Sequence, residues 1–262
     1  MRTRISLAWL PVVFVLSLTI VGAQGQPLAM VDAWVAAHQR ELVTSLATLV
    51  SQPSVRGNTE GLRQTATTVR DLFAGKGFTA SLIETPGAPL VFAEMRAPGA
   101  TRTLLLYLHY DGQPVDPPRW KQPTPFTPVL RTGRLDAANV REIPNLASID
   151  RFDPEWRLYG RATADDKGPI VALLGAVDAL KTAGMPLRWN LKVLLDGEEE
   201  SSSTGLKAVA DANRARFAAD LLLMLDGPAH PSGRPTLVFR SEEHTSELQS
   251  HLNLVCRLLL EK

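Results

Sequence analysis

The sequence predicts a layered α/β fold. Apolar, strand-like runs alternate with segments whose apolar residues recur at helical spacing. Three Leu-rich runs, at residues 104–106, 193–195 and 221–223, suit strands that are buried on both faces. Ligands of such sheets bind beyond the carboxyl ends of the strands. Acidic residues follow these runs directly, so the same pattern also predicts where a functional site lies.

The elements can be placed from periodicity and from their end signals. Helices are expected at residues 29–51, 59–74, 168–183 and 204–213. Pro53 stops the first helix, and Asn58 or Thr59 caps the second. Strands are expected at residues 79–83, 90–95, 103–108, 190–195 and 221–225, with a further one beginning at 235–239. Residues 112–158 read as long loops with one strand around 128–132, and loops of that length are often functional.

Composition excludes several classes of protein. The chain has 262 residues, of which 45% are hydrophobic and 21% charged, as in an ordinary globular protein with one sizeable domain or slightly more. A net charge of +1 gives no indication of a nucleic-acid or acidic surface partner. Cys256 is the only cysteine, so no disulfide framework is expected.

The N-terminus has the pattern of a secretory signal peptide. Arg2 and Arg4 precede an apolar run at about residues 7–21, and small residues follow at 21–23. We therefore expect residues 1–23 to be removed on export to the periplasm or the extracellular space, with no stable membrane insertion afterwards. An uncleaved membrane anchor is the alternative, but the run is short for a spanning helix.

The C-terminal tail differs in character from the rest. Residues 240–250 resemble the translated read-through of a sequencing-library adapter. We therefore expect residues 241–262 to be non-native, in which case His244, His251 and Cys256 carry no function. A genuine amphipathic C-terminal helix is the alternative.

Four acidic clusters stand out in the middle of the chain. They are Leu108-His109-Tyr110-Asp111, Asp165-Asp166-Lys167-Gly168, Glu198-Glu199-Glu200 and Leu225-Asp226. Oxygen ligands with one imidazole, brought together by a sheet, suit a pair of divalent metals. A carboxylate beside such a site can also act as a general base. His109 and Asp111 point to one side of an extended segment, so one can bind metal while the other orients it.

Each cluster alone also has a structural explanation. Asp165 or Asp166 could cap the following helix, although two adjacent aspartates exceed that need. The glutamate triplet could be a solvated turn, and Asp226 a turn residue before Gly227. The usual nucleophile-elbow, phosphate-loop, dinucleotide-binding and H-E-x-x-H signatures are missing from the sequence.

Together the clusters resemble the motifs of the M20 metallopeptidases, the group of carboxypeptidase G2, carnosinase-type dipeptidases and acylamino-acid deacylases. Residues 108–115 are similar to Gly-His-Tyr-Asp-Val-Gln-Pro-Val, and residues 160–168 to Gly-Arg-Gly-x-x-Asp-Asp-Lys-Gly. Residues 196–201 are similar to Glu-Gly-Glu-Glu-Glu-Ser, and residues 225–228 match the Asp-Gly-Pro step. The resemblance covers roughly residues 30–240, with departures at positions that flank the acidic residues.

The resemblance implies a three-layer αβα zinc-exopeptidase-like domain with a mixed, mostly parallel sheet. It also implies two Zn²⁺ ions, with Co²⁺ or Mn²⁺ as substitutes. His109 and Asp226 would hold one ion, Glu200 the other, and Asp165 would bridge them. Asp111 would orient His109, and Glu199 would be the general base for a metal-activated water that hydrolyses a peptide or amide bond.

The resemblance also implies that more of the family's domain belongs to the intact protein. Residues 24–240 would be a partial catalytic domain without the lid and dimerisation domain and without a final histidine ligand. The intact protein would act on a small peptide or N-acyl amino acid and could form a homodimer. The alternatives are an inactive fragment that at most binds metal, and an acidic Ca²⁺ or Mg²⁺ protein, which His109 disfavours.

Overall fold

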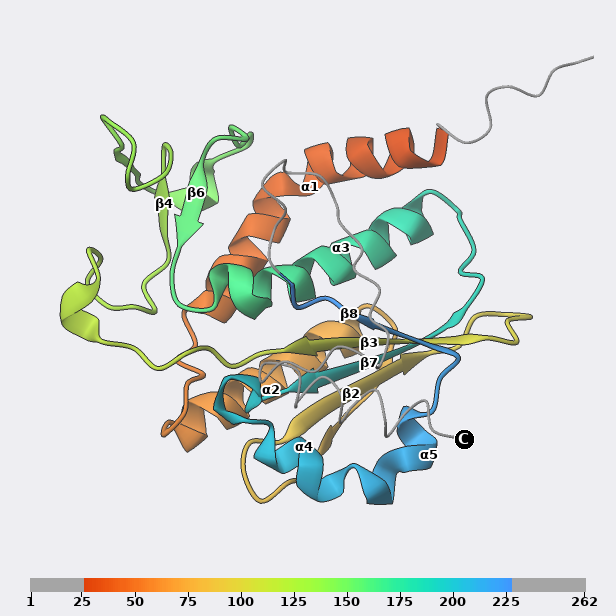
Figure 1. Ribbon diagram of the computed structural model, residues 1–262. Coiled ribbons are helices and arrows are strands. Elements are labelled where there is room, and N and C mark those ends of the chain that lie inside the picture. Colours follow the sequence, from red (N-terminus) through yellow and green to blue (C-terminus); the bar gives the residue numbers. More distant parts are fainter. Residues whose placement is uncertain (1–25, 228–262) are drawn as a thin grey trace, which may run out of the picture.

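A five-stranded mixed sheet forms the centre of the structure, a computed structural model that describes residues 26–227 (Figure 1). Its order is β1 (Thr79–Ile83), β2 (Leu90–Met95), β7 (Asn190–Asp196), β3 (Thr103–His109) and β8 (Leu221–Met224). Strand β2 is antiparallel to both neighbours, whereas β3 is parallel to β7 and β8. Four strands therefore point the same way, and the mixed, mostly parallel sheet is confirmed.

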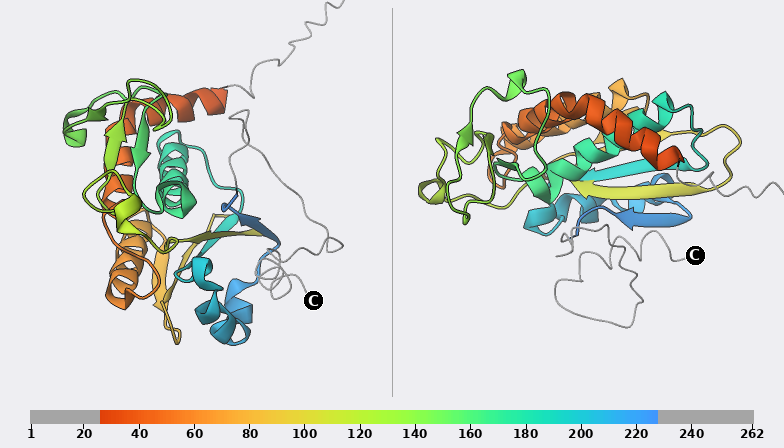
Figure 2. Two further views of the ribbon diagram at one scale, coloured as in Figure 1. Left: turned by 60° about the vertical axis from the view of Figure 1, so that its left-hand side comes forward. Right: turned by 90° about the horizontal axis from the view of Figure 1, so that it is seen from above.

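Helices cover both faces of this sheet and make three layers (Figures 1 and 2). On one face lie α1 (Gln26–Val50), α2 (Thr59–Gly75) and α3 (Gly168–Thr182). Their buried residues, with Phe73 and Leu174 among them, form one hydrophobic core with the sheet. On the other face α4 (Thr204–Val209) and α5 (Arg214–Phe217) pack over a second, smaller core.

Local signals explain most of the element ends. The Asn58 side chain accepts a hydrogen bond from the Gly61 N–H at 3.0 Å, which caps α2 as expected. The helix expected at residues 204–213 is wrong in its extent, because α4 ends at Val209 and a 3₁₀ turn, Asp211–Asn213, separates it from α5.

Residues 112–160 contain more regular structure than the sequence predicts. Strands β4 (Val129–Arg131), β5 (Glu142–Ile143) and β6 (Arg157–Tyr159) form a small antiparallel sheet. One 3₁₀ turn, Pro117–Arg119, precedes β4, and another, Leu146–Ser148, lies between β5 and β6. Only β4 was expected. Strands of two or three residues are too short for an alternating pattern and are held by pairing with β4 instead.

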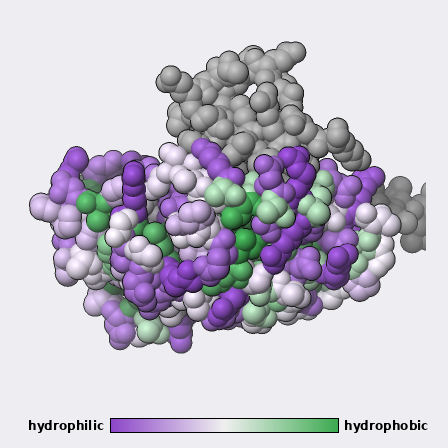
Figure 3. Space-filling view, turned by 90° about the horizontal axis from the view of Figure 1, so that it is seen from below, coloured by the Kyte–Doolittle hydropathy of each residue, from purple (hydrophilic) through white to green (hydrophobic). Residues whose placement is uncertain are grey.

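The predicted signal segment, the strand expected at 235–239 and the predicted non-native tail lie outside the described residues. Within residues 26–227, no helix combines the length and the apolar character needed to cross a membrane. Seen from below, the surface is mixed, with a small hydrophobic area among hydrophilic residues (Figure 3).

Candidate metal centre

The acidic clusters meet at the edge of the sheet where β3, β7 and β8 end. His109 is the last residue of β3 and lies opposite Asp196, the last residue of β7. Glu199 begins a 3₁₀ turn, Glu199–Ser201, just after β7, and Asp226 follows β8. Asp165 belongs to a short π-helical turn, Thr163–Lys167, that leads into α3. Segments that are distant in sequence therefore bring their side chains to one place, as parallel strands predict.

His109 lies at the centre of this arrangement and is fully buried. Its Nε2 atom is 2.8 Å from Asp165 Oδ1 and 4.0 Å from Asp226 Oδ2. Its Nδ1 atom is 3.1 Å from the main-chain oxygen of Asp111 and 3.3 Å from Asp111 Oδ1. Nε2 therefore faces the carboxylates of Asp165 and Asp226, while Nδ1 faces Asp111.

Asp111 connects the histidine to the glutamate turn. Its Oδ1 and Oδ2 atoms accept hydrogen bonds from the N–H groups of Glu199 and Glu200, each at 3.2 Å. The Asp111 carboxylate is almost completely buried, so these hydrogen bonds offset the loss of its hydration. Asp111 thus contacts both halves of the centre, in line with the orienting role that the sequence suggests.

A possible first set of ligands is His109, Glu199 and Asp226, which each place one donor atom within 4.8 Å of the others. The family resemblance instead implies that Glu200 holds a metal and that Glu199 is the general base. Glu200 accepts a close hydrogen bond from the Gln113 side-chain amide. The structure thus places both glutamates at the centre, and the division of roles between them stays a prediction.

The protonation states fit a site that binds cations. Burial disfavours protonated His109, but hydrogen bonds to Asp111 and Asp165 outweigh it and raise the His109 pKa to about 11. Burial raises the pKa of Glu199 to about 7, and also raises the pKa of Glu200 and of Asp226. The hydrogen bond from His109 lowers the pKa of Asp165. An imidazolium thus balances carboxylates that repel one another, a position that a metal ion could take.

From the sequence, one of the two aspartates is expected to cap the helix or pair with Lys167 while the other faces the site. The buried Asp166 carboxylate accepts the His109 main-chain N–H at 3.1 Å, and burial raises the Asp166 pKa to about 8. Lys167 is also buried, and its Nζ atom donates to the Leu49 and Gln52 carbonyls, each at 2.8 Å. The pair therefore fastens the Asp165 turn to β3 and to the end of α1. The sequence signal for this role was the second of two adjacent aspartates, because one aspartate is enough to cap a helix.

Glu198 and Asp196 were left unassigned. Glu198 Oε2 accepts the Gly205 N–H at 2.9 Å, near the start of α4, and so lies away from His109. Asp196 is fully buried, and its Oδ1 atom accepts the Glu198 N–H at 2.9 Å. A supporting role for Asp196 could have been inferred from its position, because it is an acidic residue at the end of a buried strand.

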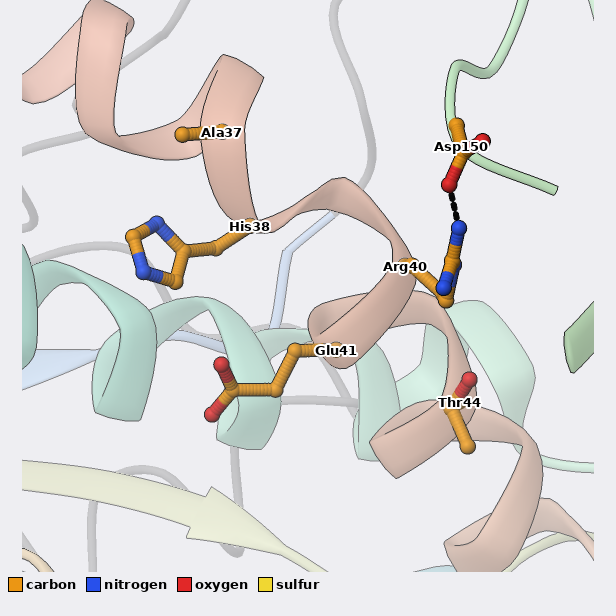
Figure 4. A pocket seen from close by; sticks show the side chains of 6 residues that line it. All are labelled: Ala37, His38, Arg40, Glu41, Thr44 and Asp150. Atoms are coloured by element: carbon orange, nitrogen blue, oxygen red, sulfur yellow. Dashed lines mark ion pairs between the residues drawn. The ribbon is translucent and has the colours of Figure 1, made fainter. Parts of the chain in front are cut away.

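A pocket beside α1 is lined by other residues (Figure 4). Two of the residues that line it, Arg40 and Asp150, form an ion pair, shown by the dashed line. The lining residues are Ala37, His38, Arg40, Glu41, Thr44 and Asp150. None of them belongs to the acidic clusters, so the pocket does not bear on the metal centre.

The fold and the centre define a class: a three-layer α/β domain with histidine and carboxylates gathered at the carboxyl edge of its sheet. Residues 146–249 match the model of peptidase family M20/M25/M40. A Cys-Gly metallodipeptidase of Schizosaccharomyces pombe is 26% identical over 158 residues, which are 60% of this chain and 29% of that protein. The Beta-Ala-His dipeptidase of Homo sapiens is 26% identical over 156 residues, 59% of this chain and 26% of that protein.

Solved structures agree with these matches. The M20 family metallo-carboxypeptidase Sso-CP2 from Sulfolobus solfataricus superposes with a TM-score of 0.59 at 31% identity. The superposition covers 74% of this chain and 39% of that structure. The chain therefore resembles the M20 metallopeptidases in sequence and in fold, as its four motifs predict, and it spans well under half the length of these relatives.

Proposed function

We propose that the protein is a zinc-dependent hydrolase of peptide or amide bonds, acting on dipeptides or N-acyl amino acids. The observation that carries the proposal is the convergence of His109, Glu199 and Asp226, with donor atoms within 4.8 Å of one another. Relatives described as a Cys-Gly metallodipeptidase and a Beta-Ala-His dipeptidase support a small peptide as substrate. The intact protein is proposed to carry this activity.

The residues present fit a pair of metal ions. One imidazole with several carboxylates is a donor set that zinc accepts, and Co²⁺ or Mn²⁺ can take its place. His109 and Asp226 would hold one ion, Glu200 the second, and Asp165 both. Bound there, the metals supply an acidified water and a polarised carbonyl oxygen.

Glu199 is the proposed general base. A carboxylate with a pKa of about 7 is balanced between its two protonation states at neutral pH. It can therefore take a proton from the attacking water and pass it to the leaving amine. Asp111 holds Glu199 for this task through the main-chain N–H, and at the same time it contacts His109 Nδ1.

A competing assignment makes Glu199 a metal ligand, which the three-residue cluster favours. The test substitutes Glu199→Ala and Glu200→Ala separately in the intact protein and measures both Zn²⁺ content and dipeptide hydrolysis. We expect Glu199→Ala to abolish turnover and keep the metal, whereas Glu200→Ala loses metal. Loss of metal from Glu199→Ala alone would exchange the two roles. Hydrolysis that survives Glu199→Ala would overturn the base assignment.

The second candidate function is metal binding without hydrolysis. This chain covers only a small share of the length of its relatives. Metal binding without hydrolysis therefore stays an alternative for these residues. Binding of Zn²⁺ by the 262-residue chain, with no cleavage of a set of dipeptides by that same chain, would support it.

A further inference from the structure

Asp196 is a fully buried carboxylate that has no part in the proposed chemistry. It ends β7, opposite His109, and its exposed fraction is 0%. A buried anion is costly unless its oxygens are satisfied. What surrounds Asp196 therefore indicates why the fold keeps an acid there.

The partners of Asp196 within residues 26–227 are hydrogen-bond donors rather than cations. Oδ1 accepts the Glu198 N–H at 2.9 Å, and Oδ2 accepts the Tyr107 hydroxyl at 3.3 Å. The Ser203 side chain forms a further hydrogen bond to the carboxylate. Glu198 and Ser203 flank the 3₁₀ turn that carries Glu199 and Glu200, so the carboxylate holds that turn from both sides.

The same turn is held by a second buried carboxylate. Asp111 accepts the next two main-chain N–H groups, those of Glu199 and Glu200. Three successive amides are thus held by two acids, each at the end of a neighbouring strand. The main-chain carbonyl of Asp196 also accepts the Tyr110 N–H at 2.9 Å, which ties β7 to the segment between His109 and Asp111.

We propose that Asp196 is a positioning residue that fixes the turn of Glu199 and Glu200 relative to His109. The inference rests on the proposed function in that these glutamates serve the metal centre. Partners that orient ligands from behind typically contribute 10–100-fold in metal affinity. Asp196 acts through the accepting oxygen that meets the Glu198 N–H.

The test uses Asp196→Ala in the full chain and compares it with two controls. Val69→Ala is the first control, because Val69 is a fully buried residue of the core on the other face of the sheet. Asp196→Asn is the second, since its amide oxygen has the same reach and can still accept the Glu198 N–H. Two quantities are measured: Co²⁺ affinity with its visible absorption spectrum, and hydrogen exchange of the amides at 198–200 in the metal-free chain.

We expect Asp196→Ala to bind Co²⁺ roughly 10–100-fold more weakly, with an altered spectrum and faster exchange at 198–200. Val69→Ala should lower the thermal midpoint but leave affinity and exchange near those of the unsubstituted chain, and Asp196→Asn should restore most of both. Asp196→Ala that matches Val69→Ala in affinity and exchange would overturn the proposal, as would Asp196→Asn that behaves like Asp196→Ala.

Two further measurements keep the outcome decisive. If Asp196→Ala does not fold, Asp196→Val replaces it, because its side chain fills more of the space and offers no acceptor to the Glu198 N–H. If the unsubstituted chain binds no Co²⁺, that result contradicts the proposed metal-dependent function. Hydrogen exchange in the metal-free variants still tests whether Asp196 fixes the turn. Unprotected amides at 198–200 in the unsubstituted chain would refute the proposal directly.

Discussion

Metal binding should release protons from this centre, because without a bound cation His109 is protonated at neutral pH and Glu199 is partly protonated. His109 has a pKa raised to about 11, and Glu199 one raised to about 7. A histidine must be neutral to bind a metal. Addition of Zn²⁺ at pH 7 is therefore expected to displace about one proton from His109 and about half a proton from Glu199.

The same pKa values set the pH dependence of affinity. Protons compete with the metal, so affinity rises with pH. Between pH 6 and pH 8, His109 stays protonated without metal and contributes about tenfold per pH unit, or roughly 100-fold. Glu199 contributes roughly another tenfold as the pH passes through about 7. The expected gain is roughly 1,000-fold, and the raised pKa values of Glu200 and Asp226 act in the same direction.

Isothermal titration calorimetry with Zn²⁺ in buffers of different ionisation enthalpy measures the released protons directly. Glu199→Gln is the matched control, since it keeps the size of the side chain and removes the group that titrates. Release should fall from about 1.5 to about 1 proton at pH 7 in this variant. An affinity that does not change between pH 6 and pH 8, with no released proton, would refute the assignment of His109 as a ligand.

Three further predictions concern stability. Burial lowers the pKa of Lys167 to about 7, so the unfolded chain binds a proton there that the folded chain does not. Its contribution to stability should therefore rise between pH 7 and pH 10, and urea unfolding of Lys167→Met should lack this rise. Asn58→Ala should lower the unfolding free energy by about 1 kcal/mol through loss of the hydrogen bond from the Gly61 N–H; an unchanged urea midpoint would contradict the cap. Gly197→Ala should cost about 1–3 kcal/mol, because a Cβ would lie 2.1 Å from the Tyr110 hydroxyl oxygen, and an unchanged thermal midpoint would show that the ring moves freely.

Long elements were predictable because their apolar pattern extends over several residues. The bounds of β1 (Thr79–Ile83) and β2 (Leu90–Met95) match those expected, and α2 differs by one residue. The strands β5 and β6 were not predictable, since two or three residues carry no period and the pairing with β4 is non-local. The break after α4 was missed for a related reason, as helical spacing continues across the 3₁₀ turn.

The candidate site was predictable in its location but not in the roles of adjacent acids. Apolar runs that end in acidic residues locate the edge of a parallel sheet, but neighbouring side chains project differently once the backbone leaves the strand. Glu198 turns toward the start of α4, whereas Glu199 faces His109 and Asp226. These directions follow from hydrogen bonds between the turn and two buried acids. Asp111 lies far from the turn in sequence, whereas Asp196 lies just before it. We therefore expect the supporting acids Asp111 and Asp196, which set the direction of each glutamate, to decide which carboxylate binds metal and which moves a proton.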